Sequence, residues 1–137
     1  MTPSEQGFPR SCRLARPADF DRVYGLRHSA AAGQLVVYAA ANGRADGAVR
    51  IGLSVSRRIG TAVVRNRWKR RLREAFRLVR GRLPAAHDLV VVVRSGLPAP
   101  GAEGLERTAT ALVALATRAA DRAAGPPSAG PRRGRGA

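Results

Sequence analysis

The residues most able to do chemistry form a dense run of positive charge in the middle of the chain. Residues 57–82 contain eleven arginines and lysines and a single acid, Glu74. Positive charges at this density repel one another unless a polyanion lies nearby. Arginine suits a polyanion because its planar guanidinium makes paired hydrogen bonds to phosphate. These residue types predict binding to nucleic acid, with an anionic membrane surface as the second class of partner.

The charges are arranged with the period of an α-helix. Thr61 suits an N-cap, and Gly81 followed by Pro84 suits the end of a helix. At 100° per residue one side is apolar, and it contains Val64, Trp68, Leu72, Ala75, Phe76 and Val79. The opposite side is basic, and it contains Lys69, Arg70, Arg73, Arg77 and Arg80. The pattern predicts a helix that packs with one side and presents cations on the other.

A simpler interpretation is that the basic side is an ordinary solvated helix face. Solvated faces usually mix signs, because like charges four residues apart destabilise a helix by a few tenths of a kcal/mol. Lys69, Arg73 and Arg77 follow one another at this spacing. Glu74 can relieve only Arg70 or Arg71 locally. The pattern therefore favours phosphate binding.

The rest of the composition does not suggest a catalytic site in the polypeptide. A protein nuclease needs metal-binding carboxylates or an acid–base pair near a phosphate, and the nine acids are scattered. His28 and His87 have no obvious partner, and the single Cys12 excludes an intramolecular disulfide and argues against structural zinc. We predict no catalytic residue and no metal ligand, and we expect a binding protein.

Around the basic helix, the sequence predicts a helix at 16–24 and two strands at 35–40 and 49–56. A turn-rich segment, 42–47, separates the strands, so we expect an antiparallel hairpin. Alternation would bury Val49, Ile51, Leu53 and Val55 and leave an open face lined by Arg50, Gly52, Ser54 and Ser56.

The remaining segments complete one α/β domain, a two-layer α+β sandwich. Residues 25–33 read as a connector, 89–93 as a strand covered on both faces, 96–104 as a loop and 105–123 as a helix. A further short strand is expected near Gln34 or Arg44. The domain is predicted to span 13–123, with disordered tails at 1–12 and 124–137. No apolar stretch could span a membrane or serve as a signal peptide, so a cytoplasmic protein is expected.

A specific motif lies at residues 54–76, ungapped. It rests on Ser56, Arg57, Arg58, Gly60, Ala62, Val63, Arg65, Asn66, Arg67, Lys69, Arg70 and Arg73. This segment resembles the signature of the bacterial ribonuclease P protein subunit family, and weaker likeness extends over roughly 13–120. Trp68 departs from the family pattern, which has an aliphatic residue there, and Leu35 stands where phenylalanine is common.

The resemblance implies features that the residues alone do not. The basic helix would join two parallel strands of a small mixed sheet of about four strands by a left-handed crossover, against the usual right-handed rule. One set of residues would bind the catalytic RNA subunit: Arg65, Asn66, Arg67, Lys69, Arg70 and Arg73. A second set would bind the single-stranded 5′ leader of precursor tRNA: Phe20, Tyr24, Tyr38, Arg50, Ser54, Ser56 and Arg57.

The function implied is that of the protein subunit of ribonuclease P, an endonuclease that removes the 5′ leader from precursor tRNA and leaves a 5′-phosphate. The RNA subunit with Mg²⁺ would carry the chemistry, and a monomeric protein would position the leader and broaden the substrate range. Two alternatives stay open at this point: a general or ribosomal RNA-binding protein, and a membrane-active cationic protein.

Overall fold

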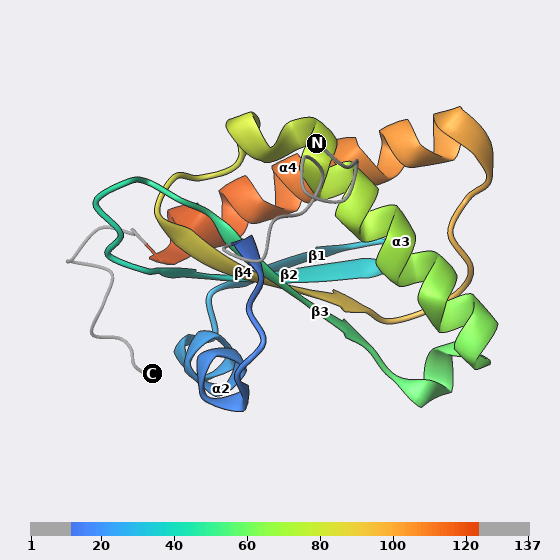
Figure 1. The fold of residues 1–137 in the computed structure, drawn as a ribbon, viewed down its shortest axis with the longest axis horizontal. Helices are drawn as coiled ribbons and strands as arrows, with labels where there is room; N and C mark the ends of the chain where they lie inside the picture. Colours follow the sequence, from blue (N-terminus) through green and yellow to red (C-terminus); the bar gives the residue numbers. More distant parts are fainter. Residues whose placement is uncertain (1–11, 124–137) are drawn as a thin grey trace, which may run out of the picture.

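The computed structural model describes residues 12–123, which form an α+β fold with one mixed sheet (Figure 1). Two single-turn 3₁₀ segments, Arg57–Ile59 and Arg80–Arg82, flank the basic helix. The main elements are α2 (Pro17–Leu26), β1 (Ser29–Ala32), β2 (Leu35–Ala41), β3 (Arg50–Val55), α3 (Ala62–Val79), β4 (His87–Val93) and α4 (Gly101–Ala123). The predicted α+β class with a small mixed sheet of four strands is confirmed, and the expected extra strand is β1, inside the segment expected to be a connector.

The strand order in the sheet is β1-β2-β4-β3. Strand β4 is antiparallel to β2 and parallel to β3, with Val37 opposite Val91 and Leu53 opposite Val91. The predicted hairpin between 35–40 and 49–56 is therefore wrong, because β4 lies between these strands. The physical reason is that β4 is apolar on both faces and buried on both, so it takes the central position, while β2 forms its hairpin with β1.

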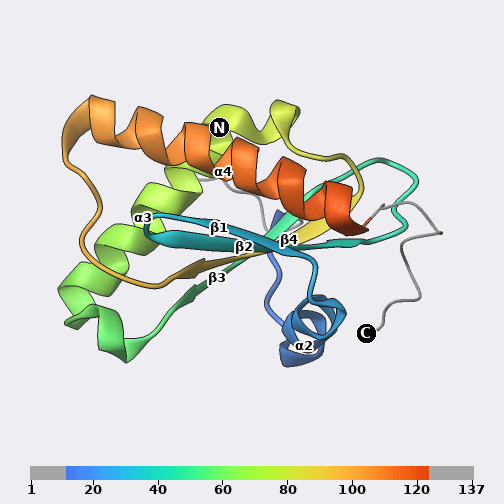
Figure 2. The ribbon, with the colours of Figure 1, turned by 180° about the vertical axis from the view of Figure 1, so that it is seen from behind.

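Helices α3 and α4 lie on one face of the sheet and α2 lies on the other (Figures 1 and 2). The segment β3–α3–β4 joins two parallel strands, as the family resemblance implies. The left-handed sense of this crossover stays a prediction.

The main core lies between the sheet and helices α3 and α4. All six residues of the predicted apolar side of α3 pack there, with Trp68 and Phe76 almost completely buried. Val49, Ile51, Leu53 and Val55 also face this core, so the predicted alternation of β3 is confirmed. Trp68 fills the role of a large core residue and donates a hydrogen bond from Nε1 to the Gly96 carbonyl at 2.8 Å.

Two boundaries differ from the predictions. Helix α4 begins at Gly101 rather than at 105. Gly104, predicted to lie in a loop, is a buried helical residue. It lies so close to the Ala99 backbone that a side chain at this position would collide with it. The sequence predicts that Cys12 belongs to a disordered N-terminal tail, yet its side chain is buried in the core. The predictions for residues 1–11 and 124–137 lie outside the described residues.

Candidate nucleic-acid interface

Helix α3 carries all six predicted RNA-subunit-binding residues, which together form the basic face of the helix, opposite and beside its apolar side. Thr61 caps the helix, its hydroxyl accepting from the Val64 N–H at 3.4 Å, which fixes where the basic face begins. Asn66, Arg67, Arg70 and Arg73 are exposed. Arg65 and Lys69, at the edge of the apolar side, are half-buried. The structure thus places all six predicted residues on one helix, four of them exposed to solvent and two at the edge of its buried side.

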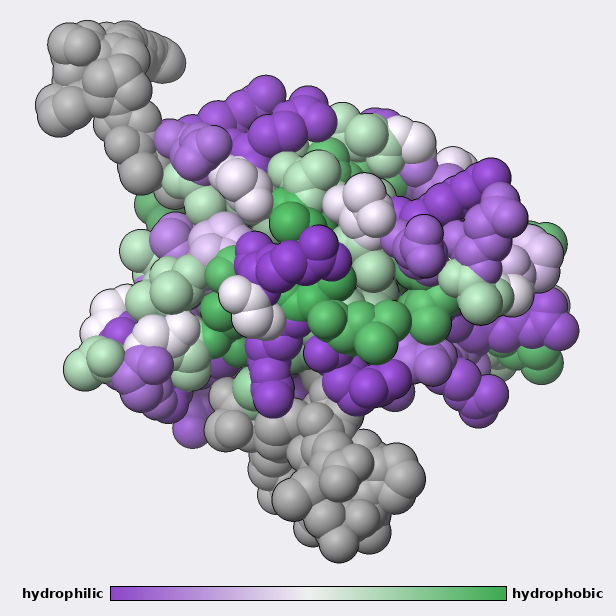
Figure 3. All heavy atoms as spheres, turned by 90° about the horizontal axis from the view of Figure 1, so that it is seen from above, coloured by the Kyte–Doolittle hydropathy of each residue, from purple (hydrophilic) through white to green (hydrophobic). Residues whose placement is uncertain are grey.

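The surface around these helices is strongly polar. Viewed from the side on which α3 and α4 lie, hydrophilic side chains cover much of the molecule and leave smaller apolar areas between them (Figure 3). Among residues 12–123, the side chains of Arg67 and Arg70 have no ion-pair or hydrogen-bond partner. Their charges are therefore available to an external anion.

The three aromatic residues predicted for the leader meet on the opposite face of the sheet. Phe20 and Tyr24 come from α2, and Tyr38 comes from β2. The ring centroids of Tyr24 and Tyr38 are 4.9 Å apart in an edge-on arrangement, and those of Phe20 and Tyr24 are 6.4 Å apart. All three side chains are half-buried over a small apolar cluster that includes Val23 and Val90. Each of the three residues packs on this cluster and keeps part of its surface exposed.

This face of the sheet is less open than the sequence predicted. Gly52 is buried, because Phe20 and Leu14 lie directly over it. A Cβ atom at position 52 would lie 2.6 Å from Cζ of Phe20, so only glycine lets this ring rest against β3. Of the other residues predicted here, Ser54 is half-buried, and Ser56 and Arg57 are exposed where β3 leads toward α3.

Arg50 has an internal partner. Its Nε and Nη2 atoms donate to the two oxygens of Asp88 at 2.8 and 2.6 Å, and Asn42 donates to the same carboxylate at 3.0 Å. Arg22 of α2 forms a further ion pair with Asp88. The guanidinium of Arg50 is thus committed to the protein, and it is the least available of the predicted leader contacts.

Asp88 is fully buried, and burial by itself raises the pKa of its carboxyl group. Hydrogen bonds from Arg50 and Asn42 and the charges of Arg50 and Arg22 outweigh that effect, so the pKa is lowered and the group is ionised. Because its partners come from α2, β3 and the loop after β2, this carboxylate fixes α2 on the sheet. Sequence reasoning missed it; the available signal was a lone acid at the start of an apolar strand.

Among residues 12–123 we find no helix with the length and hydropathy needed to cross a bilayer. In the same part of the chain, no three histidine, cysteine, aspartate or glutamate side chains are grouped so that they could hold a metal ion.

A mixed sheet with a cationic helix on one face and clustered aromatic residues on the other defines a nucleic-acid-binding module. The chain belongs to the ribonuclease P protein family, because the family model described as "Ribonuclease P" matches residues 8–117. It is accordingly a protein subunit of ribonuclease P, an endoribonuclease that works as a ribonucleoprotein with its RNA.

Relatives and solved structures agree with this assignment. The chain is 41% identical over 99 residues to the ribonuclease P protein component of Brevibacillus brevis, covering 72% of this chain and 78% of that protein. The structure of the Staphylococcus aureus RNase P protein matches with a TM-score of 0.61 at 34% identity, covering 76% of this chain and 91% of that one. The Thermotoga maritima protein matches with a TM-score of 0.54 at 34% identity, covering 60% and 73%.

Proposed function

We propose that this chain uses two separate surfaces to join two RNAs: the catalytic RNA of ribonuclease P on the basic face of α3, and the 5′ leader of precursor tRNA on the aromatic face beside α2. The observation that carries the proposal is the placement of these surfaces on opposite faces of one sheet (Figures 1 and 2). The product would be tRNA with a mature 5′ end bearing a phosphate.

The basic face suits a folded RNA. Arginine forks bind phosphates in pairs, and Asn66 between Arg65 and Arg67 offers a donor and an acceptor for a base edge or a ribose hydroxyl. Lys69, Arg70 and Arg73 extend the same field along the helix. No acid on α3 other than Glu74 opposes it.

The aromatic face suits an unpaired strand. Exposed parts of Phe20, Tyr24 and Tyr38 can stack on bases at ~1–3 kcal/mol per base with little sequence preference. Such tolerance fits a protein that serves many precursors. Ser54, Ser56 and Arg57 would contact the leader backbone, while Arg50 would act mainly through Asp88, which holds α2 in place.

The chemistry would belong to the RNA subunit, with Mg²⁺ held by RNA and substrate and none held by the protein. The protein would contribute positioning of the leader and relief of the repulsion between two polyanions, which broadens the range of precursors cleaved. A monomer in the ribonucleoprotein and a cytoplasmic location are part of this proposal.

The test is reconstitution with the cognate catalytic RNA at low Mg²⁺. Adding the protein should raise the rate of precursor cleavage, because its cations replace part of the screening that Mg²⁺ supplies. In the presence of the catalytic RNA, the complex should bind precursor more tightly than mature tRNA. Absence of stimulation would reject the proposal, and equal binding of both tRNAs would favour a general RNA-binding protein.

A further inference from the structure

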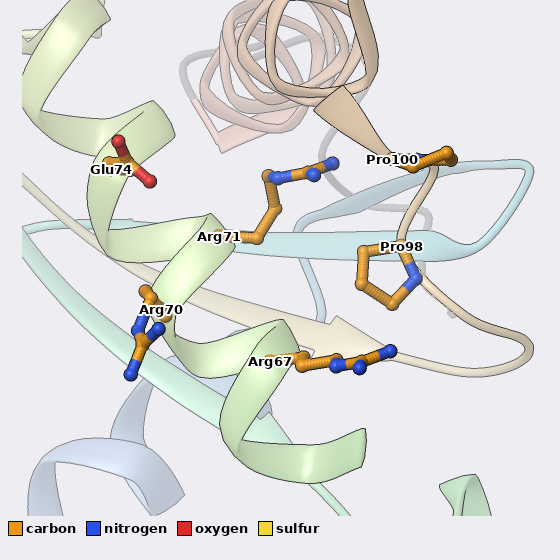
Figure 4. Close-up of a pocket in the computed structure, with 6 residues that line it drawn as sticks. All are labelled: Arg67, Arg70, Arg71, Glu74, Pro98 and Pro100. Carbon is orange, nitrogen blue, oxygen red and sulfur yellow. The ribbon is translucent and has the colours of Figure 1, made fainter. Parts of the chain in front are cut away.

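A hollow of about 400 Å³ lies between α3 and the loop from β4 to α4 (Figure 4). Its size falls in the ~300–1,000 Å³ range of pockets that hold small organic ligands, so it is too large for a lone ion. It is lined by Arg67, Arg70, Arg71, Glu74, Pro98 and Pro100. Arg71, Glu74 and both prolines lie outside the RNA-binding set proposed above.

One wall of the hollow is charged. Arg67 and Arg71 are four residues apart on α3, and both side chains extend toward the proline loop, whereas Arg70 and Glu74 lie farther from it (Figure 4). Like charges at this spacing repel, and an anion between them removes that cost. Arg71 has one neutral partner, the Thr108 hydroxyl at 3.4 Å. The side chains of Arg67 and Glu74 have no polar partner among residues 12–123.

The other wall is apolar and held in place from both sides. Trp68 donates to the Gly96 carbonyl at 2.8 Å, and Gln34 donates through Nε2 to the Leu97 carbonyl at 2.8 Å. Pro98 directly follows these tethered residues, and its ring fixes its own φ angle. The proline loop is therefore held in one position opposite the arginines before any ligand binds.

We propose that this hollow holds one unstacked nucleotide of the catalytic RNA, with its phosphate between Arg67 and Arg71 and its sugar or base against Pro98. Glu74 then accepts a hydrogen bond from a base amino group or a 2′-hydroxyl at the mouth of the hollow. A free inorganic anion would leave the proline wall unused, and a base that rests against Pro98 cannot also stack within a duplex, so the ligand is an unpaired nucleotide. This inference rests on the proposed function, because it places the contact within the same ribonucleoprotein.

The two walls make different predictions for binding to the catalytic RNA as salt is varied. Arg71→Gln should weaken binding and lower the slope of log K against log salt by ~1, because one phosphate contact is lost. Pro98→Ala with Pro100→Ala should weaken binding by about five-fold and leave the slope unchanged, because no charge is removed. Arg118→Gln, on the exposed side of α4, is the matched control for charge and should change binding by less than about two-fold.

Thermal melting by circular dichroism checks that each variant folds, and Thr108→Val separates loss of the Arg71–Thr108 bond from loss of the phosphate contact.

Leu97→Cys gives an independent measurement. Leu97 is exposed beside the hollow and the natural Cys12 is buried, so a photoreactive probe can be attached at position 97 alone. The probe should crosslink to one short unpaired stretch of the catalytic RNA, whereas a probe at Arg118→Cys should not.

The outcomes separate the two hypotheses. If the unaltered protein binds the RNA but the proline variant binds equally well, or if the crosslinks fall in duplex RNA, the nucleotide site is wrong and the proposed function stands. If the unaltered protein does not bind the catalytic RNA at all, the proposed function fails and this inference fails with it.

Discussion

Arg67 is exposed on the basic face of α3 without a polar partner in the described part of the chain. Replacing it with alanine should weaken binding to the catalytic RNA and lower the salt slope by ~1, because one cation no longer displaces a counterion. Nitrocellulose filter binding at several salt concentrations measures both quantities. Arg118→Ala is the control for general loss of charge, and an equal effect of the two changes would contradict a specific surface on α3.

Tyr38 tests the other surface. Tyr38→Ala should spare binding to the catalytic RNA and weaken the affinity of the complex for precursor tRNA by ~1–3 kcal/mol at most, because one stacking ring is removed. Fluorescence titration with precursors that carry or lack a leader measures the difference. Tyr38→Phe keeps the ring and should behave nearly as the unaltered protein does. If Tyr38→Ala and Arg67→Ala affected every RNA equally, the two-surface arrangement would be wrong.

At the residue level, the sequence predicted side chains that follow a local rule and missed those that depend on distant segments. The basic side of α3 follows from helical period alone. Asp88 does not, because its partners Arg22, Asn42 and Arg50 come from three other parts of the chain. The same holds for Pro98, which meets α3 only because Trp68 and Gln34 tether the intervening loop.

At the level of elements, α3 was predictable from cap to end, whereas the pairing of the strands was not. Capping by Thr61 and the spacing of apolar residues are properties of one segment. Strand order depends on which strand needs two neighbours, and that is decided by burial on both faces of β4. Sequence proximity of 35–40 and 49–56 favoured a hairpin that tertiary packing overrode.

The attachment of α2 to the sheet should depend on Asp88. Asp88→Asn should lower the free energy of unfolding by ~2–3 kcal/mol. This is below the ~3–5 kcal/mol of fully buried pairs, because Arg22 and Arg50 keep 39% and 24% of their side-chain surface exposed. Urea unfolding measures the loss. Arg22→Gln should cost less, since Arg50 and Asn42 remain, and an Asp88→Asn protein as stable as the original would show that the cluster is not structural.

The same carboxylate sets a dependence on pH. Its folded-state pKa lies below the unfolded value of ~3.9, so its contribution is fully present above that value and is lost as pH falls through the folded-state pKa. The stability advantage over Asp88→Asn should therefore be constant from pH 7 to about 5 and shrink below about 4. Asp46, whose pKa the hydrogen bond from Arg44 lowers to about 2, is present in both proteins and cancels. An advantage that persists undiminished at pH 3 would contradict this assignment.

For the whole molecule, a net charge of +16 makes affinity for RNA steeply dependent on salt. If six cations of the basic face meet phosphates, log K should fall by ~4–5 per decade of salt, at ~0.7–0.9 per contact. Filter binding to the catalytic RNA between 50 and 500 mM KCl (roughly one decade) measures the slope. A slope near 1 would mean that the basic face is mostly solvated, like an ordinary helix surface.

The overall architecture could be predicted from the sequence, because the signature at 54–76 is specific and the family implied parallel strands joined through α3. The position of α2 on the sheet face opposite the other helices could not be predicted, because a ten-residue helix can pack on either face. It is placed by Gly52, which makes room for the Phe20 ring, and by the buried carboxylate of β4.

The central place of β4 also bears on how the chain is made. Synthesis proceeds from the N-terminus, and His87–Val93 is the last strand of residues 12–123 to leave the ribosome. Until then β3 has no neighbouring strand along its length, and β2 has only β1. We therefore expect the four strands to pair in one late step, after the cationic helix α3 has already emerged. During that interval the nascent chain would expose the basic segment of α3 to RNA before the sheet that supports this helix has formed.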